Sequence, residues 1–475
     1  MKTWNRFSRT AVITVCAAAT LSCVHPTAQA QAQMQAQTPA KSLPSFSIGA
    51  DYVDYPQTRG KTQEFHLSEI PSWLTIDFQI RERLESQAGY QYLHGNNRIY
   101  DLTREWGGVT VHPSEWFTAY MQFMDNHALG LPIAHQASNM RDDFDLRQGY
   151  LEVISGPVQI YGGRRELRFG SERVVGISDY TNNARSWDGI FGHFDLPGVK
   201  NSIDIFTTSV VAISPESLDK HGAGLTFHGI YGTLHSFLPK DNTLQPFVLV
   251  KDIKRVKSNQ GTFGTENEVT FGFEGSGKLP AHFSYDLLAD LQRGSYSSNS
   301  IHAGADIAKL YYTFEKVPLR PRIGGEYEYA TGNPHTNPNH ISTYDQLYPS
   351  NHDALGFFDL FGFQNIKEQR VNLDLTPQKN LSLLVQGEAL GVASRLDSIY
   401  SGAGSVSIAV PTGGFKTNSI GDGFDLSGKY LLTPYLVLNA AYSHYFPGSL
   451  MYQVNKGVPL NYSMVSLTYR FRVDK

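Results

Sequence analysis

Hydrophobic and polar residues alternate strictly over several stretches of this chain, each about ten residues long. Between residues 73 and 85, the even positions from Leu74 to Ile80 are apolar and the odd positions from Thr75 to Arg83 are polar. The same period of two recurs in residues 267–276, 282–292, 370–375 and 463–473. This period indicates β-strands with one apolar and one polar face, and ten residues suffice to cross a bilayer at a tilt.

The connections between these stretches alternate between two kinds. Tight connections rich in Pro, Gly or Asn occur at residues 112–114, 155–157, 196–198, 279–280, 317–318, 376–378 and 433–434. Longer ones lie between them, at residues 86–100, 127–143, 170–184, 332–365, 394–421 and 447–462. A soluble β-sandwich has no reason to sort its loops in this way. The pattern predicts an all-β fold, a single transmembrane antiparallel β-barrel of about 18 strands with short periplasmic turns and long extracellular loops.

The first 72 residues precede the predicted barrel, which spans residues 73–475. Residues 1–30 have the form of a signal peptide, with three basic residues, an apolar run at 11–21 and the small-x-small site Ala28-Gln29-Ala30. The run is too short to span a bilayer, and a retained anchor or a lipid-modified Cys23 are the alternatives to cleavage. Residues 31–72 are predicted to be a partly disordered periplasmic lead-in that lies under or inside the pore. We expect the bacterial outer membrane as the location.

Composition excludes several classes of function. Both cysteines lie within residues 1–30, so the mature chain would contain no disulfide, thiol nucleophile or cysteine metal site. Without residues 1–30, 37 Lys and Arg residues face 44 Asp and Glu residues, a net charge of -7 and no basic footprint for nucleic acid. The 16 histidines are scattered, without a nucleophile motif or metal-ligand spacing. We therefore expect no enzymatic activity, no catalytic residue, no metal and no cofactor.

The last strand carries an assembly cue and closes the barrel. The alternation from Val465 to Phe471 resembles the terminal signal that the barrel-assembly machinery recognises. Leu467 should contact outer-membrane lipid, and Thr468 and Arg470 should face inwards. Because this strand should pair with the first one, we expect Arg470 near the level of Asp77, with which it could pair across the seam.

Arginines predominate among the charged positions predicted to line one wall of the lumen. Arginine is the side chain best suited to bidentate contact with carboxylates. Of the neighbours Arg164 and Arg165, only one can point inwards in a regular strand. The opposite wall should carry Glu326 and Glu328 beside Arg370. The predicted pore residues are Arg81, Arg83, Arg147, Arg164, Arg168, Arg185, Asp188, Glu326, Glu328, Arg370 and Arg470.

Two long motifs point to a known family. Residues 163–170, 173–176 and 182–189, and then residues 344–353 and 356–362, resemble in order the two signatures of the alginate export family of outer-membrane barrels. The resemblance covers roughly residues 70–475, and Arg165 departs from a family pattern that more often has Gln. It implies an eighteen-stranded barrel that passes an anionic polysaccharide along pore arginines, with periplasmic polysaccharide-secretion proteins as possible partners.

The second motif lies in the longest loop, residues 332–365, which is unusually apolar. Leu355 to Phe358 and Leu360 to Phe363 would be costly to leave in water, so we expect this loop to fold over or into the mouth. Its predicted gate residues are Tyr344, Asp345, Tyr348, Asn351, His352 and Asp353.

Three functions fit this sequence. The chain could be a passive, electrostatically selective channel for an anionic polysaccharide or oligosaccharide of the alginate type. It could instead be a porin for small anionic or sugar solutes. The third alternative is a structural or adhesive barrel whose loops bind something outside the cell.

Overall fold

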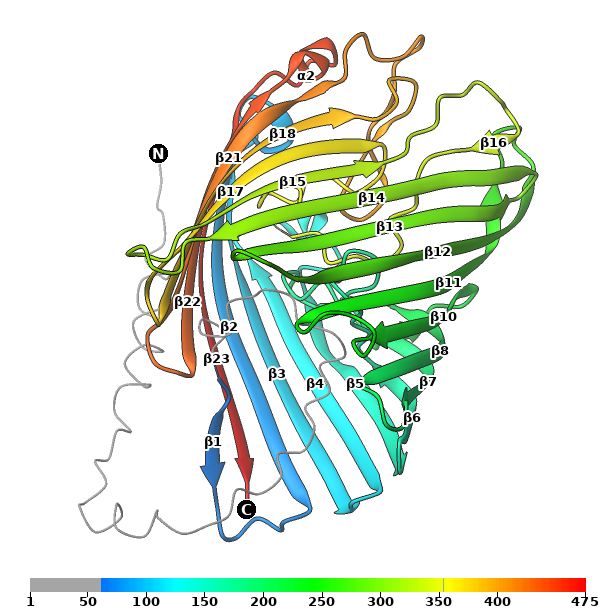
Figure 1. The fold of residues 1–475 in the computed structure, drawn as a ribbon. Coiled ribbons are helices and arrows are strands. Elements are labelled where there is room, and N and C mark those ends of the chain that lie inside the picture. Colours follow the sequence, from blue (N-terminus) through cyan, green and yellow to red (C-terminus); the bar gives the residue numbers. More distant parts are fainter. Residues whose placement is uncertain (1–60, 353) are drawn as a thin grey trace, which may run out of the picture. The chain divides into compact units, whose positions relative to one another are not determined.

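The structure is a computed structural model that describes residues 61–352 and 354–475, and these residues form a closed antiparallel β-barrel of 18 strands (Figure 1). The predicted all-β fold is confirmed. The first nine strands are β2 (Leu74–Ala88), β3 (Arg98–Ser114), β4 (Phe117–Leu129), β5 (Asp142–Ser155), β6 (Val158–Arg165), β7 (Trp187–Asp195), β8 (Asn201–Ala212), β10 (Leu225–Leu234) and β11 (Asn242–Lys257). The other nine are β12 (Phe263–Leu279), β13 (Phe283–Tyr296), β14 (Asn299–Thr313), β15 (Arg322–Ala330), β17 (Ile366–Gln378), β18 (Leu381–Val392), β21 (Ser419–Leu431), β22 (Leu436–Pro447) and β23 (Leu460–Asp474).

The barrel closes where the last strand, β23, pairs with the first, β2. Arg470 lies directly opposite Gln79 and donates a hydrogen bond of 2.8 Å to its side-chain oxygen. Arg470 therefore lies near the level of Asp77, two residues away, and Arg472 is the residue directly opposite Asp77. The offset between first and last strands depends on the stagger of the whole barrel, which no single strand encodes.

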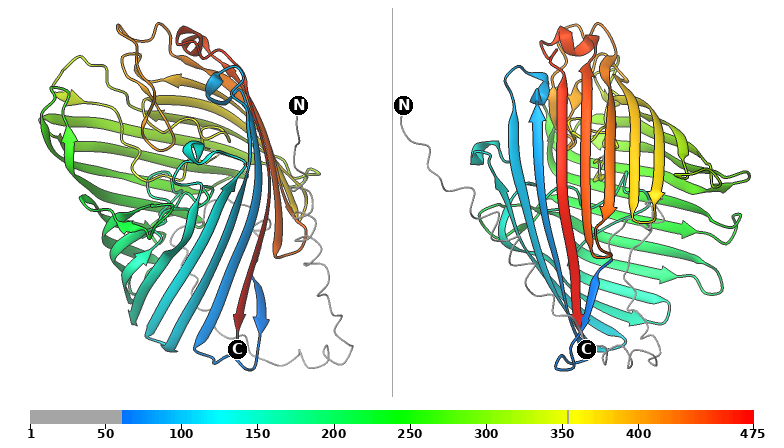
Figure 2. Two further views of the ribbon diagram at one scale, coloured as in Figure 1. Left: turned by 180° about the vertical axis from the view of Figure 1, so that it is seen from behind. Right: turned by 90° about the vertical axis from the view of Figure 1, so that its left-hand side faces the viewer.

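The lead-in meets the barrel at the end where the chain terminates. The short strand β1 (Gln63–His66) runs parallel to the end of β23, beyond the point where β22 stops pairing with it (Figure 2). The predicted signal peptide and residues 31–60 lie outside the described residues.

Connections at the two ends of the barrel differ in length. At the end that holds β1, the longest connection is residues 314–321. At the other end, the connections 166–186, 331–365 and 393–418 are long, whereas 258–262 and 297–298 are as tight as the opposite turns. The long connections contain the minor elements η2 (Tyr90–Tyr92), η3 (Ile133–His135), β9 (Lys220–His221), β16 (His340–Ile341), β19 (Ile399–Tyr400), β20 (Val406–Ile408) and α2 (Ser449–Gln453). Among the described residues, no helix is both long and apolar enough to cross a membrane.

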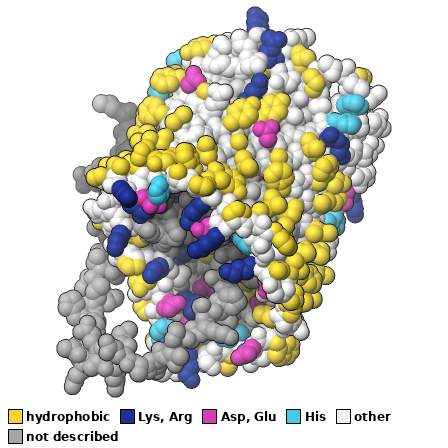
Figure 3. Space-filling model, viewed as in Figure 1, with side chains coloured by type: hydrophobic (Ala, Val, Ile, Leu, Met, Phe, Trp, Pro, Cys, Tyr) yellow, Lys and Arg dark blue, Asp and Glu magenta, His cyan; other side chains and the backbone are white. Residues whose placement is uncertain are grey.

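The alternation along each strand separates an apolar outer face from a polar lumen. On β2, Ile80 and Leu84 are 43% and 49% exposed, whereas Arg81 and Arg83 are 7% and 2% exposed. On the face shown in Figure 3, hydrophobic side chains cover much of the outer surface, and Lys and Arg side chains gather around the hollow that faces the viewer. This is the arrangement that a strand needs between lipid and an aqueous or polar interior.

Two long loops fold into the barrel and build a core there. They are residues 166–186, here called the arginine-motif loop, and residues 331–365, here called the gate loop. The buried aromatic residues Phe169, Tyr344 and Phe363 are at most 1% exposed. A barrel of 18 strands encloses more space than its own side chains fill, so the loops can bury their apolar residues inside it.

Candidate functional site: an arginine cluster under two inward loops

Four arginines from one part of the wall project into the lumen and form what we call the arginine cluster. They are Arg81 and Arg83 on β2, Arg104 on β3 and Arg147 on β5, and none is more than 7% exposed. Arg81 lies directly opposite Arg104 in the β2–β3 ladder. The guanidinium groups of Arg104 and Arg147 both stack on the ring of Trp106, at 4.0 and 3.5 Å from its centroid.

The arginine cluster binds the backbone of the arginine-motif loop. Arg81 donates hydrogen bonds to the carbonyl oxygens of Asp179 and Tyr180, at 3.0 and 3.2 Å. Arg104 donates to the carbonyl of Asp179 at 2.6 Å and to that of Asn182 at 2.9 Å. Arg83 donates to the Tyr180 carbonyl, and its guanidinium lies 3.9 Å from the centre of the Tyr180 ring. The loop backbone thereby supplies acceptors to buried charged donors.

One carboxylate of the loop also enters the cluster. An oxygen of Asp179 accepts a charged hydrogen bond of 2.8 Å from Arg104. Burial by itself would raise the pKa of the Asp179 carboxyl, but Arg104, Arg168 and Arg81 hold that pKa well below its usual range. Asp179 is therefore ionised when the loop is docked, and it occupies a site built for an anion.

A second loop carboxylate, Glu166, joins the cluster to Arg168. Glu166 accepts hydrogen bonds from Arg147 and, at 3.1 Å, from Arg168, which also donates to Glu172 at 3.1 Å. Burial opposes ionisation of Glu166, but the charges of Arg147 and Arg168 lower its pKa to about 2. Predicted pore residues Arg81, Arg83, Arg147 and Arg168 are thus brought together in one network.

Arg164 and Asp188 lie on the outer side of the wall, and the prediction that they face the pore is wrong. They pair directly across β6 and β7 at 2.8 Å and lie on the same face of these strands as the exposed residues Ile160 and Ile190. Arg165 is the inward member of the arginine pair and stacks 3.8 Å from the centre of the Tyr161 ring. Arg164 and Arg165 are adjacent polar residues, so the alternation in the sequence could not show which of the two faces the lumen.

The opposite wall carries the predicted acidic residues within a larger ion-pair network. Glu326 lies 3.5 Å from Arg370 and 3.2 Å from Lys309, and Glu328 lies 2.5 Å from Arg173 of the arginine-motif loop. The strand residues of this wall that sequence reasoning missed include Lys309 on β14, and Glu368 on β17 and Glu388 on β18, which lie 2.6 and 3.2 Å from Arg370.

The gate-loop residues contact the wall and the other loop. The Tyr344 hydroxyl donates to Asp290 at 2.9 Å, Asp345 pairs with Lys251, and Asn351 accepts a hydrogen bond of 3.2 Å from Arg173. The predicted pore residue Arg185 donates a hydrogen bond of 2.7 Å to the backbone carbonyl of Tyr348 in the gate loop. His352 contacts Asp359 at 3.0 Å. Asp353 lies outside the described residues.

Sequence reasoning left Asp179, Glu166 and Asn182 out of the site. Asn182 is 1% exposed and donates to three backbone carbonyls, including that of Thr103 at 2.7 Å. All three residues lie within or beside the first family motif, which is a signal that could have identified them. Their partners on distant strands could not be read from the chain.

The fold and this site define a class: a closed barrel with an apolar outer belt and a charged lumen is an outer-membrane channel. Solved structures with the same fold include OccK11 of Pseudomonas aeruginosa (11% identity, 86% of this chain and 98% of that chain, TM-score 0.55). OprD of Pseudomonas aeruginosa (10% identity, 88% and 97%, TM-score 0.55) and OccAB2 of Acinetobacter baumannii (10%, 85% and 99%, TM-score 0.57) are similar to the same degree. At these identities, the likeness shows the fold alone.

The family follows from the sequence itself. The family model for alginate export matches residues 72–465, so the chain belongs to the alginate export family and is located in the outer membrane. No curated protein sequence matches it significantly.

Proposed function

We propose that this channel passes an anionic polysaccharide or oligosaccharide of the alginate type by passive diffusion along lumen arginines. The observation that carries the proposal is the carboxylate of Asp179 held by Arg104 inside the arginine cluster. Membership in the alginate export family supports the same substrate class. The proposed function is transport without a catalytic step.

The mechanism is an exchange of one carboxylate for another. Each uronate unit of such a polymer carries one carboxylate, which offers Arg104 and Arg81 the same acceptor atoms as Asp179. The planar guanidinium group binds carboxylates through paired hydrogen bonds, and an incoming uronate would therefore compete with the docked loop. Displacement of the arginine-motif loop would clear the lumen beside the cluster for the chain to pass.

The test is current blockade by uronate oligomers in planar bilayers that contain the purified channel. Wild type should be blocked in a concentration-dependent way. Arg104→Gln removes charged hydrogen bonds worth about 1.5–3 kcal/mol, so the blocking concentration should rise by about 10- to 100-fold. Asp179→Asn removes the internal competitor, so this variant should be blocked at lower concentration than wild type.

The matched control is Asp188→Asn, which alters an arginine–carboxylate pair on the outer face and should leave blockade unchanged. Equal blockade by neutral oligosaccharides of the same length would overturn the electrostatic mechanism. Blockade by uronate monomers as strong as that by oligomers would favour a porin for small solutes. A barrel that never conducts, with the loops in place or displaced, would favour the structural or adhesive alternative.

A further inference from the structure

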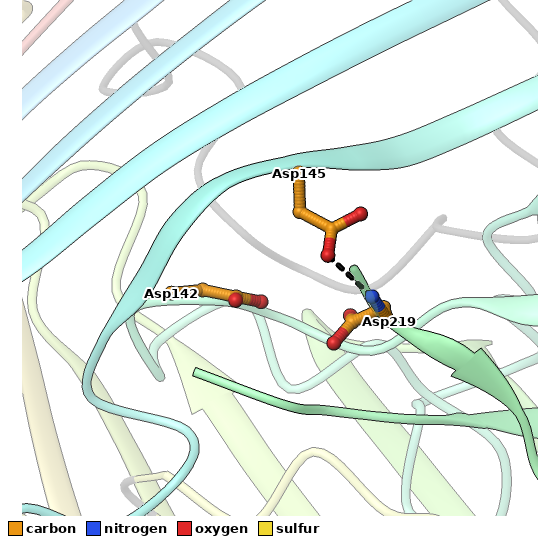
Figure 4. A group of neighbouring side chains, drawn as sticks. All are labelled: Asp142, Asp145 and Asp219. Atoms are coloured by element: carbon orange, nitrogen blue, oxygen red, sulfur yellow. Dashed lines mark hydrogen bonds between the residues drawn. The ribbon is translucent and has the colours of Figure 1, made fainter. Parts of the chain in front are cut away.

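Three carboxylates meet at the end of the barrel that carries the long loops. They belong to Asp142 and Asp145 on β5 and to Asp219 in the connection 213–224 (Figure 4). One oxygen from each lies within 4.8 Å of the other two. Like charges at this separation repel strongly unless a cation or protons lie among them.

Asp142 is the member that points to a ligand. Its residue is 0% exposed, and neither carboxylate oxygen has a hydrogen-bond partner. Its carboxylate is directed towards that of Asp219 in Figure 4. The amide oxygen of Asn126, which pairs with Asp142 across β4 and β5, is also buried without a hydrogen bond. Buried polar atoms in proteins nearly always have a bonding partner. These three oxygens have no hydrogen-bond donor, and they therefore point to a bound cation.

The other two carboxylates are positioned but not neutralised. Asp145 accepts backbone hydrogen bonds from Leu146 and Asp219, each at 2.5 Å, and Asp219 accepts one of 2.7 Å from Ser214. These backbone N–H groups orient the carboxylates but carry no positive charge, so they do not offset the repulsion among the three groups.

The two arginines nearest this group form ion pairs with other acids. Arg141 pairs with Glu216, and Arg164 pairs with Asp188 at 2.8 Å. A comparable group among the described residues, Glu266, Glu268 and Asp345, differs because Lys251 pairs with two of its members. Lys251 already supplies a positive charge to that group, whereas no ion pair found among the described residues joins Asp142, Asp145 or Asp219 to a basic side chain.

We propose that Asp142, Asp145 and Asp219 bind a calcium ion. Their ligands are oxygen atoms alone, which suit hard cations, and Ca²⁺ accepts irregular geometry in which backbone carbonyls and water complete the shell. Mg²⁺ requires a nearly ideal octahedron and loses its water reluctantly, so it should bind more weakly here.

The position of the site gives the ion a structural role. β6 pairs with β5 only from Gly149 to Ser155, so the first half of β5 has no strand neighbour on that side. The connection 213–224 runs beside this open edge, where the Asp143 N–H donates to the Pro215 carbonyl at 3.2 Å. A calcium ion shared by Asp142, Asp145 and Asp219 would fasten the connection to the edge and close the wall above the short strands β6 and β7.

The test uses the mature chain refolded into detergent. Such a sample contains no lipopolysaccharide, which would itself bind calcium. Calorimetric titration with CaCl₂ should show one saturable site per chain. The double variant Asp142→Asn/Asp219→Asn should lose it, and Asp143→Asn, which changes the exposed neighbouring carboxylate, should keep it. The proposal would be overturned if wild type did not bind calcium, or if wild type and the double variant bound it equally. Tighter binding of MgCl₂ than of CaCl₂ would also contradict it.

A second measurement separates metal binding from misfolding. In EDTA, Asp142→Asn relieves carboxylate repulsion, so its unfolding midpoint should lie above that of wild type. In excess CaCl₂ the order should reverse because only wild type gains the ion. The same order under both conditions would contradict a calcium site.

Discussion

At the scale of single residues, the side of the wall on which a residue lies decides its environment. Arg164 and Arg165 are neighbours in the chain, yet one pairs with Asp188 outside and the other stacks on Tyr161 inside. Arg165 ends β6, so the outward charge of Arg164 lies at the end of the wall, where it also contacts the Asp219 carbonyl at 3.3 Å. A charge placed outside near the middle of the wall would meet lipid.

A pair of substitutions on β23 tests this rule. Leu467 is 38% exposed on the outer face, and Thr468 is 5% exposed in the lumen opposite Arg81. Leu467→Arg puts a charge into lipid and should destabilise the barrel by about 2–4 kcal/mol near the midplane. Thr468→Arg places a second positive charge in the lumen directly opposite Arg81, which should lower the stability of the barrel by about 0.2–1 kcal/mol.

The readout is the heat-modifiable gel shift of the folded barrel, with both variants run beside wild type. Leu467→Arg should show a reduced folded fraction and a lower melting temperature. Greater damage by Thr468→Arg would mean that the inward and outward faces of β23 are exchanged.

At the scale of elements, the two inward loops are joined to each other. The Tyr348 N–H donates to the Val174 carbonyl at 3.0 Å, and the Gly176 N–H donates back to the Tyr348 carbonyl at 2.8 Å. The Ser350 N–H adds a bond of 2.8 Å to the Glu172 carbonyl. Because these backbone bonds link the arginine-motif loop to the gate loop, release of one loop should loosen the other.

Acid should release the arginine-motif loop. The pKa of Asp179 lies well below its usual range, and that of Glu166 is about 2, in the docked loop. Carboxylates with lowered pKa values stabilise docking fully above the ordinary carboxyl range near pH 4, and this stabilisation is lost as the pH falls through the lowered values. Single-channel conductance should therefore increase as the pH falls from about 4 towards 2.

The Asp179→Asn variant is the control for this pH dependence. It lacks one of the two titrating groups, so its conductance should already be higher at neutral pH and should change less in acid. The gel shift must show an intact barrel at both pH values. Conductance that falls in acid, in a barrel that stays folded, would contradict release of the loop.

At the scale of the whole molecule, the lumen has two differently charged walls. The arginine cluster lies on β2, β3 and β5, and a group of acidic residues faces the lumen from β15, β17 and β18 around Arg370. The net charge of the chain is therefore a poor guide to the field that a permeating ion meets. In a narrow passage, nearby charges outweigh the total.

We expect the open channel to prefer anions, in spite of the net negative charge of the chain. Reversal potentials across a salt gradient measure this preference. The double variant Arg81→Gln/Arg83→Gln should shift the reversal potential towards cations, because it removes two lumen charges. Arg164→Gln, on the outer face, should not shift it. A cation preference in wild type, or equal shifts in both variants, would refute the assignment of the arginine cluster to the pore.

The sequence by itself determined the wall of this protein. Every strand of the wall lies between lipid and lumen, so each is forced into the same period of two, and residues such as Ile80 and Arg81 reveal it locally. The turn residues and the alternating loop lengths then indicated a barrel, and two motifs indicated its family. These features are local in the chain, which is why they could be read without a structure.

Only the tertiary structure decided what fills the lumen. Asp179 and Arg104 are 75 residues apart, and the contact between them depends on how an aperiodic loop folds inside the closed barrel. The choice between Arg164 and Arg165, the offset that places Arg470 opposite Gln79, and the meeting of Asp142 with Asp219 have the same origin. Each depends on barrel stagger or loop packing, which are properties of all strands together and leave no period in the sequence.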